Sequence, residues 1–346
     1  MARLTVVALA TASLVVVPNQ GDGPVADPSQ ACDVATRKIF LYAEELPPGP
    51  DGRPRLGWGT TPDNASIPGP LLEMYEGECM AITVVNDIPE ATLAQLRDDP
   101  AVGSQDPSMP LGVSLHVHGV KYTEASDGTI HTSSFVPSGQ SRTYFWYASP
   151  RVAVAGRIVD TGTAGYWWYH DHVIGTDHGT GGLYSGLFGG LVVRRPGDLL
   201  PDVQHTVVMG PNATINLERS DEEKTILFKA REGQRVEFIV IGVGDDFHTF
   251  HLHGHNWANN RTGILQSQAD ETALIDAKTI GPSESFGFQL LAGQNVGTGH
   301  WMLHCHVQFH SDVGRFSFFE VEPSDGVSLP SRVQAPADHV HYGRKG

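Results

Sequence analysis

The sequence has few basic residues and few long apolar runs. It contains 23 Lys and Arg against 39 Asp and Glu, which gives a net charge of −16 and excludes nucleic acid and anionic membranes as expected partners. One apolar run, near the start, ends at Val17 and is too short for a comfortable membrane span. Because one basic residue precedes it, the run resembles a secretory signal within a flexible segment 1–30. We therefore expect a secreted protein.

Cysteine is also scarce, with three residues. Cys305 lies between two histidines and is treated with them below. Cys32 and Cys79 can form a disulfide that ties the segment before the first strand to a strand beginning near Cys79, and export would permit this bridge. Two buried free thiols are the alternative, because the sequence does not show whether the two Cα atoms approach each other.

The chain lacks low-complexity repeats but is rich in glycine and proline, with 39 and 23 residues. Short apolar runs recur between these turn residues, which predicts an all-β fold. A chain of 346 residues is long enough for two domains, and we place them at 36–196 and 202–323, followed by a flexible tail at 324–346. Within the first domain we expect a short helix at Glu90 to Leu96 and a surface loop at Ser149 to Gly165.

The chain contains 17 histidines, and ten of them lie with Cys305 in four short clusters. The clusters are His116 and His118; His170 and His172; His248, His251 and His253; and His304, Cys305, His306 and His310. Side chains alternate faces along a strand, so each His-x-His pair places two imidazoles on one side. Eight imidazoles on such faces, four from each half of the chain, are enough ligands for three metal ions.

The same alternation separates a second site. His248 lies an odd number of positions from His251, and Cys305 points away from its two neighbours, so His248, Cys305 and His310 form their own set. Two imidazoles and one thiolate suit a blue-copper centre that transfers electrons. Zinc ligands or structural histidines are the alternative, but a closed zinc site needs only four ligands.

These clusters resemble the four copper motifs of the multicopper oxidases, and the two halves resemble the small two-domain bacterial laccases. Flanking runs such as Ser114-Leu-His-Val-His-Gly119 and Ala164-Gly-Tyr-Trp-Trp-Tyr-His-Asp-His172 strengthen the likeness. The resemblance implies two cupredoxin-like Greek-key sandwiches. It also implies a homotrimer, since no middle domain brings the two halves of one chain together and a closed ring can pair the first half of one subunit with the second half of the next.

The resemblance also implies the copper ligands. The type 2 copper would take His116 and His251. One type 3 copper would take His118, His170 and His306, and the other His172, His253 and His304. The type 1 copper would take His248, Cys305 and His310, which gives four coppers per active unit.

Further roles follow from the same resemblance. Cys305 and His310 would carry electrons, with His310 as the point where they arrive from the reductant. Asp127 and Asp276 would help to deliver protons to reduced oxygen, although Asp127 precedes a glycine and such residues often serve only as turn residues. Tyr122 would be an auxiliary electron donor, or an ordinary strand aromatic.

Arg315 departs from the family pattern, because this position usually carries a methionine as a weak axial ligand. A guanidinium stays protonated and has no lone pair for copper. One interpretation places Arg315 toward solvent or Asp312 and leaves a three-coordinate type 1 site. The other is a poorly filled or inactive type 1 site.

The implied activity is that of a laccase, which removes single electrons from phenols or aromatic amines and reduces O₂ to two waters. A cuprous-ion oxidase is an alternative, but the six scattered methionines form no methionine-rich segment. A copper nitrite reductase would leave several cluster ligands unexplained. A third alternative is a copper-binding or storage protein whose redox site is disabled at Arg315.

Overall fold

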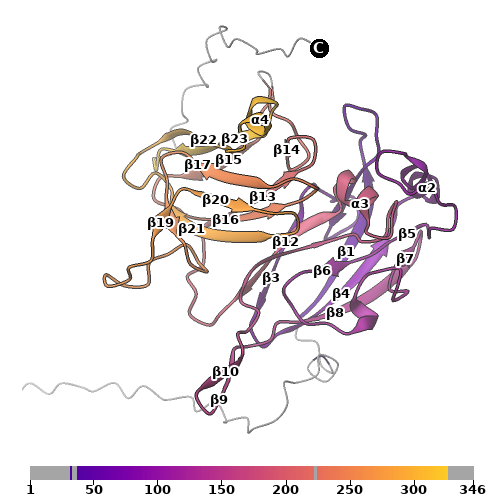
Figure 1. Cartoon of the computed structure of the whole chain (residues 1–346), viewed down its shortest axis with the longest axis horizontal. Helices are drawn as coiled ribbons and strands as arrows, with labels where there is room; N and C mark the ends of the chain where they lie inside the picture. The colour runs from indigo at the N-terminus through magenta and orange to yellow at the C-terminus, as the bar shows by residue number, and fades with distance from the viewer. Residues whose placement is uncertain (1–31, 33–36, 222–223, 326–346) are drawn as a thin grey trace, which may run out of the picture.

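The computed structural model describes Cys32, residues 37–221 and residues 224–325 of the chain. Strands dominate it and form two β-sandwiches, one from each half of the sequence (Figure 1), which confirms the all-β prediction. The signal-like segment 1–30 and most of the predicted tail at 324–346 lie outside the described residues. None of the helices in the described ranges is long and apolar enough to cross a membrane.

The first sandwich consists of two four-stranded sheets, with the orders β2-β1-β4-β8 and β3-β12-β11-β6. Its main strands are β1 (Arg37–Leu46), β2 (Arg55–Gly59), β3 (Gly69–Tyr75), β4 (Cys79–Asn86), β6 (His116–Val117), β8 (Ser141–Tyr147), β11 (Gly165–His170) and β12 (Phe188–Arg194). Its smaller elements are α2 (Glu90–Asp98), β5 (Gly112–Val113), η1 (Glu124–Ser126), β7 (Val136–Pro137), β9 (Val152–Val154), β10 (Arg157–Asp160) and α3 (Thr180–Ser185).

The second sandwich has sheets with the orders β14-β13-β16-β21 and β15-β23-β22-β17-β20. Its main strands are β13 (Val203–Gly210), β15 (Leu227–Arg231), β16 (Arg235–Gly242), β17 (His248–Leu252), β20 (Ala277–Ile280), β21 (Ser285–Leu291), β22 (Gly299–Cys305) and β23 (Phe316–Glu322). Its smaller elements are β14 (Thr214–Ile215), β18 (Trp257–Ala258), β19 (Leu274–Ile275) and α4 (Gln308–Asp312).

The two sandwiches pack on each other through their inner sheets, which contain β12 and β16. Every residue of β12 is buried, because both faces of this strand are covered. Leu191 points into the first sandwich, whereas Phe188 joins a separate apolar cluster with Ile239 and Ile241 of β16. This third core fixes the position of one sandwich on the other.

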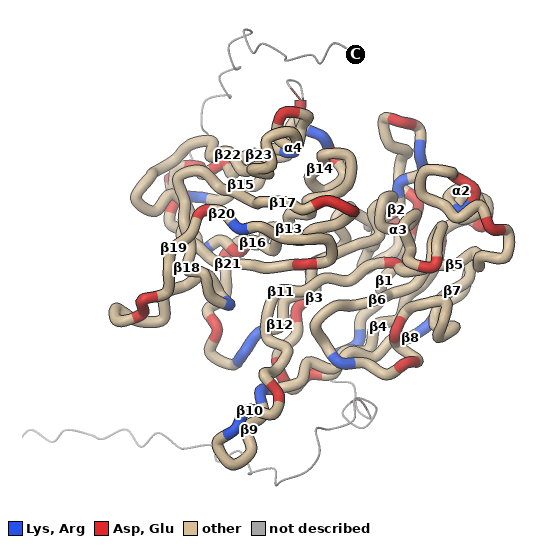
Figure 2. The backbone as a smooth tube through the Cα atoms, viewed as in Figure 1, with Lys and Arg blue, Asp and Glu red and all other residues tan. Residues whose placement is uncertain are grey.

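A buried ion pair adds polar contacts to the same interface. Figure 2 shows acidic and basic residues scattered along both halves of the backbone, yet Arg194 of β12 and Glu237 of β16 are 2% and 0% exposed. The two side chains form a bidentate contact with N–O distances of 3.0 and 2.7 Å. Tyr166, Gln204 and Gln289 also donate hydrogen bonds to the Glu237 carboxylate. A buried charge pair with this many partners is well compensated.

Of the two local predictions for the first domain, the helix is confirmed and the loop is only partly correct. The predicted helix is present as α2, which extends to Asp98. The predicted loop at Ser149 to Gly165 was wrong in part, because β9 and β10 form an antiparallel hairpin within it. Valine and isoleucine residues in both arms of this segment favour extended backbone, and a glycine with positive φ, Gly156, allows the turn between them.

Cys32 and Cys79 form a disulfide with a Cα–Cα distance of 5.4 Å, so the predicted bridge is confirmed. Because β4 begins at Cys79, the bridge joins Cys32, which precedes β1 in the sequence, to this strand.

Replacing both Cys32 and Cys79 with serine should lower the free energy of unfolding by roughly 4 kcal/mol, because the bridge closes a long loop and restricts the unfolded chain. Urea unfolding with and without a thiol reductant measures this change. The wild type and Cys305→Ser should both lose stability in reductant, whereas the double variant should be insensitive to it. A double variant as stable as the oxidised wild type would contradict the prediction.

Candidate metal centre

Each of the four histidine clusters lies where a strand ends. β6, β11, β17 and β22 end at Val117, His170, Leu252 and Cys305, so one histidine of each His-x-His pair lies within its strand and the other follows the strand end. The sheet register then brings clusters together, because His170 pairs with His116 and His304 pairs with His251. The same arrangement therefore occurs twice, once in each sandwich.

The first half-site consists of His116, His118, His170 and His172. The Nε2 atoms of His118 and His170 face each other at 3.2 Å. His116 and His170 donate from Nδ1 to the carbonyls of Asp127 and Asp171, at 2.6 and 2.7 Å. Because a carbonyl only accepts, Nδ1 carries the proton and the Nε2 lone pairs of His116 and His170 remain free for a metal ion.

The second half-site consists of His251, His253, His304 and His306, and it repeats this geometry. The Nε2 atoms of His253 and His304 are 3.3 Å apart. His251 donates from Nδ1 to the carbonyl of Asp276, and His304 donates to that of Cys305, both at 2.9 Å. The carbonyls that orient the imidazoles thus come from equivalent positions in the two sandwiches.

Burial disfavours the protonated form of several of these imidazoles. Burial, together with His116 and His172, lowers the pKa of His118 to about 4. Burial also places the pKa of His170 well below its usual value and lowers the pKa of His304. Neutral imidazole is the form that binds transition metals, so both half-sites suit copper.

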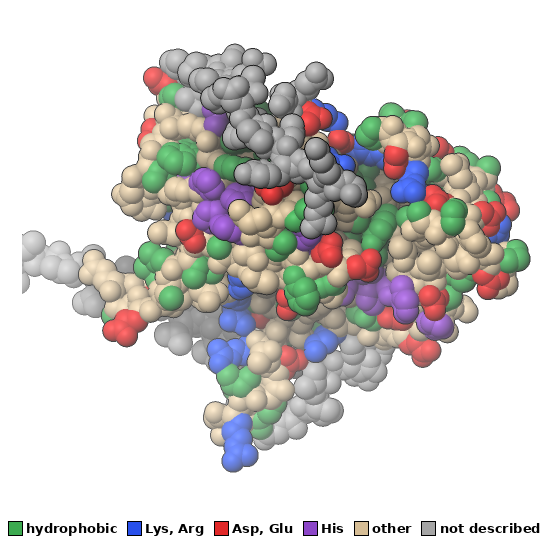
Figure 3. Space-filling view, turned by 45° about the horizontal axis from the view of Figure 1, so that its top comes forward, with side chains coloured by type: hydrophobic (Ala, Val, Ile, Leu, Met, Phe, Trp, Pro, Cys, Tyr) green, Lys and Arg blue, Asp and Glu red, His purple; other side chains and the backbone are tan. Residues whose placement is uncertain are grey.

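The two half-sites are separate within one chain. Each ring contact among the eight histidines joins two members of the same half-site. Figure 3 shows histidine side chains at separate places on the two halves of the molecule. The eight imidazoles of one chain therefore form two groups of four and do not converge on one point in the described structure.

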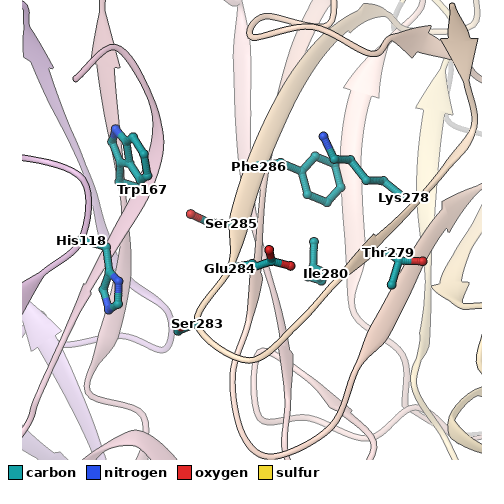
Figure 4. A pocket seen from close by; sticks show the side chains of 9 residues that line it. All are labelled: His118, Trp167, Lys278, Thr279, Ile280, Ser283, Glu284, Ser285 and Phe286. Atoms are coloured by element: carbon teal, nitrogen blue, oxygen red, sulfur yellow. The ribbon is translucent and has the colours of Figure 1, made fainter. Parts of the chain in front are cut away.

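Two cavities lie beside the first half-site. One of about 290 Å³ is lined by all four of its histidines and, from the second sandwich, by Val243, Gly244, Pro282 and Ser283. The other, of about 400 Å³, lies between the sandwiches; Figure 4 shows His118 and Trp167 on one side and Lys278 and Phe286 on the other. His118 lines both cavities, so its ring is accessible from the space between the sandwiches.

The structure also brings together His248, Cys305 and His310. Their potential ligand atoms all lie within 4.8 Å of one another, with Cys305 Sγ at 3.5 Å from His310 Nδ1. His248 and Cys305 are buried, while His310 lies on the short helix α4 and is partly exposed. The backbone of Cys305 connects this set to the second half-site, because its carbonyl accepts the hydrogen bond from His304.

The expectation that Arg315 turns toward solvent or Asp312 was wrong. Arg315 is 1% exposed, and its Nη1 lies 2.8 Å from His248 Nδ1 and 2.6 Å from His310 Nδ1. Its Nη2 donates to the carbonyl of Gly210. The guanidinium thus finds three hydrogen-bond acceptors inside the protein, and the Cys305 sulfur lies close enough to attract it. This outcome favours the interpretation of a poorly filled type 1 site.

The two kinds of site therefore differ in how well they fit copper. In the half-sites, the lone pairs of two facing Nε2 atoms repel each other unless a proton or a cation lies between them, so these pairs fit a metal ion. The His248, Cys305 and His310 set has the right donor atoms for copper, but the Arg315 guanidinium takes the space between them.

Asp127 and Asp276 lie beside their half-sites in equivalent ways. Each binds its histidine through the backbone carbonyl, and its carboxylate lies further off, at 3.7 Å from His116 Nδ1 and 3.9 Å from His251 Nδ1. Tyr122 packs edge-on against His116, with ring centroids 5.9 Å apart. Burial, followed by the Asp127 carboxylate, raises the pKa of Tyr122, so its hydroxyl stays protonated.

Replacing Asp127 with asparagine should leave the copper content of the half-sites unchanged, because the main-chain carbonyl holds His116. It should slow the reoxidation of chemically reduced, copper-loaded protein by O₂ about 100-fold, since a positioned carboxylate typically contributes this much to proton transfer. Stopped-flow absorption and copper analysis measure the two quantities. A variant that loses copper together with its rate would show that Asp127 has a structural role instead.

Sequence reasoning missed Asp171, which lies between two ligands. This side chain is fully buried, and it accepts hydrogen bonds from the backbone N–H groups of Ser114, Val173 and Ile174 at 2.8, 3.1 and 2.7 Å. It therefore ties the segment just before β6, the strand that contains His116, to the loop that follows β11. Asp171 lies between His170 and His172 as Cys305 lies between His304 and His306. This equivalent position in the sequence could have singled out Asp171.

Two cupredoxin-like sandwiches carry paired histidine clusters and a set of two histidines and one cysteine, and these donor groups could hold metal ions. Residues 198–325 match the family model described as multicopper oxidase. The second sandwich of this chain is therefore similar to the multicopper oxidase family.

Individual relatives are more distant. The chain is 29% identical to a probable nitrite reductase-hydroxylamine oxidoreductase fusion protein of Kuenenia stuttgartiensis, over 89% of this chain and 33% of that protein. It is 24% identical to a laccase of Trametes hirsuta, over 86% of this chain and 53% of the laccase. Thus the chain spans about a third and about half of these proteins.

Solved structures support the fold. The blue copper oxidase from Nitrosomonas europaea superposes with a TM-score of 0.57 at 22% identity, covering 86% of this chain and 89% of that one. At this level of identity the likeness concerns the architecture.

Proposed function

We propose that this protein is a laccase-like multicopper oxidase that couples four one-electron oxidations to the reduction of O₂ to two waters. One observation carries the proposal: each half of the chain holds four imidazoles, and their orientation leaves metal-binding nitrogens facing one another. Neither half alone supplies enough ligands for the three coppers of a trinuclear cluster.

The active unit in this proposal is a closed homotrimer. The first half-site of one subunit faces the second half-site of the next, and three identical contacts close the ring. His116 and His251 would hold the type 2 copper; the other six imidazoles would hold the type 3 pair. When bound, this cluster supplies the redox chemistry for reducing O₂, while the chain orients the imidazoles through backbone carbonyls.

The reductants in this proposal are phenols and aromatic amines. Exposed apolar side chains neighbour His310 and its partner His248 in the sequence: Phe309 and Phe247 are each 68% exposed, and Val307 is 37% exposed. Asp246 lies 3.7 Å from His310 Nε2, next to this patch. An apolar surface beside a carboxylate suits neutral or cationic aromatic molecules.

The storage alternative has one specific observation in its favour, the buried position of Arg315 among the type 1 ligands. The cuprous-ion oxidase has no methionine-rich segment in its support. For the location of the protein we propose secretion. The disulfide supports it, because disulfides persist mainly in oxidising compartments.

The test measures oligomeric state, copper content and O₂ uptake of the full-length protein at saturating copper. Uptake with a methoxyphenol by a trimer supports the proposal. Uptake with Cu(I) only would favour the cuprous-ion oxidase, and bound copper without uptake from any donor would favour storage. A fully active monomer would refute the shared cluster.

A further inference from the structure

The guanidinium of Arg315 takes part in a site that is made of metal ligands. The residue immediately precedes β23, and its side chain passes into the protein to reach His248, Cys305 and His310. One nitrogen, Nη1, donates to both imidazoles, and Nη2 is held by the carbonyl of Gly210. Hydrogen bonds thus hold both terminal nitrogens of the guanidinium in place.

These contacts compete directly with metal binding. Each imidazole has a single lone pair, and in His248 and His310 the lone pair on Nδ1 accepts an N–H of Arg315. A nitrogen cannot accept that hydrogen bond and coordinate a metal ion at the same time. In addition, the guanidinium does not deprotonate and would repel a divalent cation at this distance.

The position of the Arg315 guanidinium also leaves polar atoms unpaired, which makes this state less stable. Arg315 Nε and His248 Nε2 are both buried without a hydrogen-bond partner in the described structure. Unpaired buried polar atoms of this kind destabilise the state that contains them. A copper ion that displaces the guanidinium would remove the Arg315 part of this cost, if the side chain moves to the exposed Asp246 loop beside His310.

We propose that Arg315 competes with copper for the type 1 site, so that this site fills only at copper concentrations well above those that fill the histidine half-sites. Filling exchanges one cation for another: the guanidinium gives up His248 and His310, the Cys305 thiol releases its proton to solvent, and both imidazoles and the thiolate coordinate the metal ion. Oxidation of phenols then responds to the copper supply. This inference rests on the proposed function.

The test is a copper titration of the full-length protein. The two quantities measured at each copper concentration are the thiolate-to-copper absorption band and the bound copper per chain. In the wild type the half-sites should fill first, with about three coppers per chain, and the band should appear later. Arg315→Leu removes the competing cation without adding a ligand. It should shift the midpoint of the band to about 100-fold lower copper, the size expected for the loss of a charged donor's hydrogen bonds.

Three further variants make the result specific. Arg315→Met should shift the midpoint at least as far, and it serves as the second variant if the leucine protein unfolds. Arg219→Leu removes an exposed arginine that donates to the carbonyl of Val313, just after α4, and it should leave the midpoint unchanged. Cys305→Ser combined with Arg315→Leu should show no band, which assigns the band to Cys305.

Equal midpoints for the wild type and both Arg315 variants would overturn the competition. Failure of the proposed function has a different signature, since Arg315→Leu would then gain the band early but consume no O₂ with a phenol. That second outcome would leave the competition at Arg315 supported.

Discussion

Two variants that are each inactive should regain activity when they assemble together. His170→Ala disables the first half-site and His304→Ala disables the second, so each protein alone should lose O₂ reduction by a factor of about 1000 or more. In rings assembled at random from equal amounts, one neighbouring pair in four places two intact half-sites face to face. The mixed preparation should therefore show about a quarter of the wild-type activity.

The measurement is O₂ uptake by chemically reduced, copper-loaded protein after co-expression of the two chains. Mixing the purified rings without dissociation should give no recovery. His131→Ala removes an exposed histidine outside both half-sites and serves as the control with full activity. If the cluster were formed within one chain, the co-expressed variants would remain inactive.

Glu237→Leu should reduce the free energy of unfolding by about 3–5 kcal/mol at pH 7, because it leaves Arg194 buried with an uncompensated charge at the interface of the sandwiches. Urea unfolding measures the loss. Replacing both Glu237 and Arg194 with leucine should recover most of it. Glu73→Leu is the matched control: Glu73 also binds Arg194, but it is 38% exposed and should cost at most about 1 kcal/mol.

The same pair predicts a pH dependence. Burial alone would raise the pKa of Glu237, but hydrogen bonds and attraction from Arg194 lower it below its ordinary value of 4.5. The carboxylate therefore contributes stability above that value, and the contribution is lost as the pH falls through the lower pKa of the folded state. The difference between wild type and Glu237→Leu should shrink toward pH 3. A constant difference from pH 7 to pH 3 would contradict this account.

The sequence predicted the members of each half-site because strand geometry is simple. His116 and His118, or His304 and His306, share a side of the backbone wherever the chain is extended, whatever surrounds them. The separation of Cys305 from its two neighbours follows from the same alternation. Composition and turn residues likewise sufficed for the all-β class.

What the sequence could not supply depends on contacts between distant segments. The residue type of Arg315 favours solvent, and only the folded chain shows that Gly210, His248 and His310 place acceptors around it. Likewise, Asp171 gains its importance from three backbone N–H groups, one of which belongs to Ser114. Neither arrangement leaves a periodic pattern in the sequence from which it could be predicted.

The separation of the two half-sites within one chain has a consequence for when O₂ reduction can begin. In the proposed ring, a newly made chain holds half of a cluster at each of two places and a whole cluster at neither. It therefore lacks the full ligand set of a trinuclear cluster, and in this proposal the four-electron reduction of O₂ begins only when the ring closes. Assembly would thus determine when the activity appears.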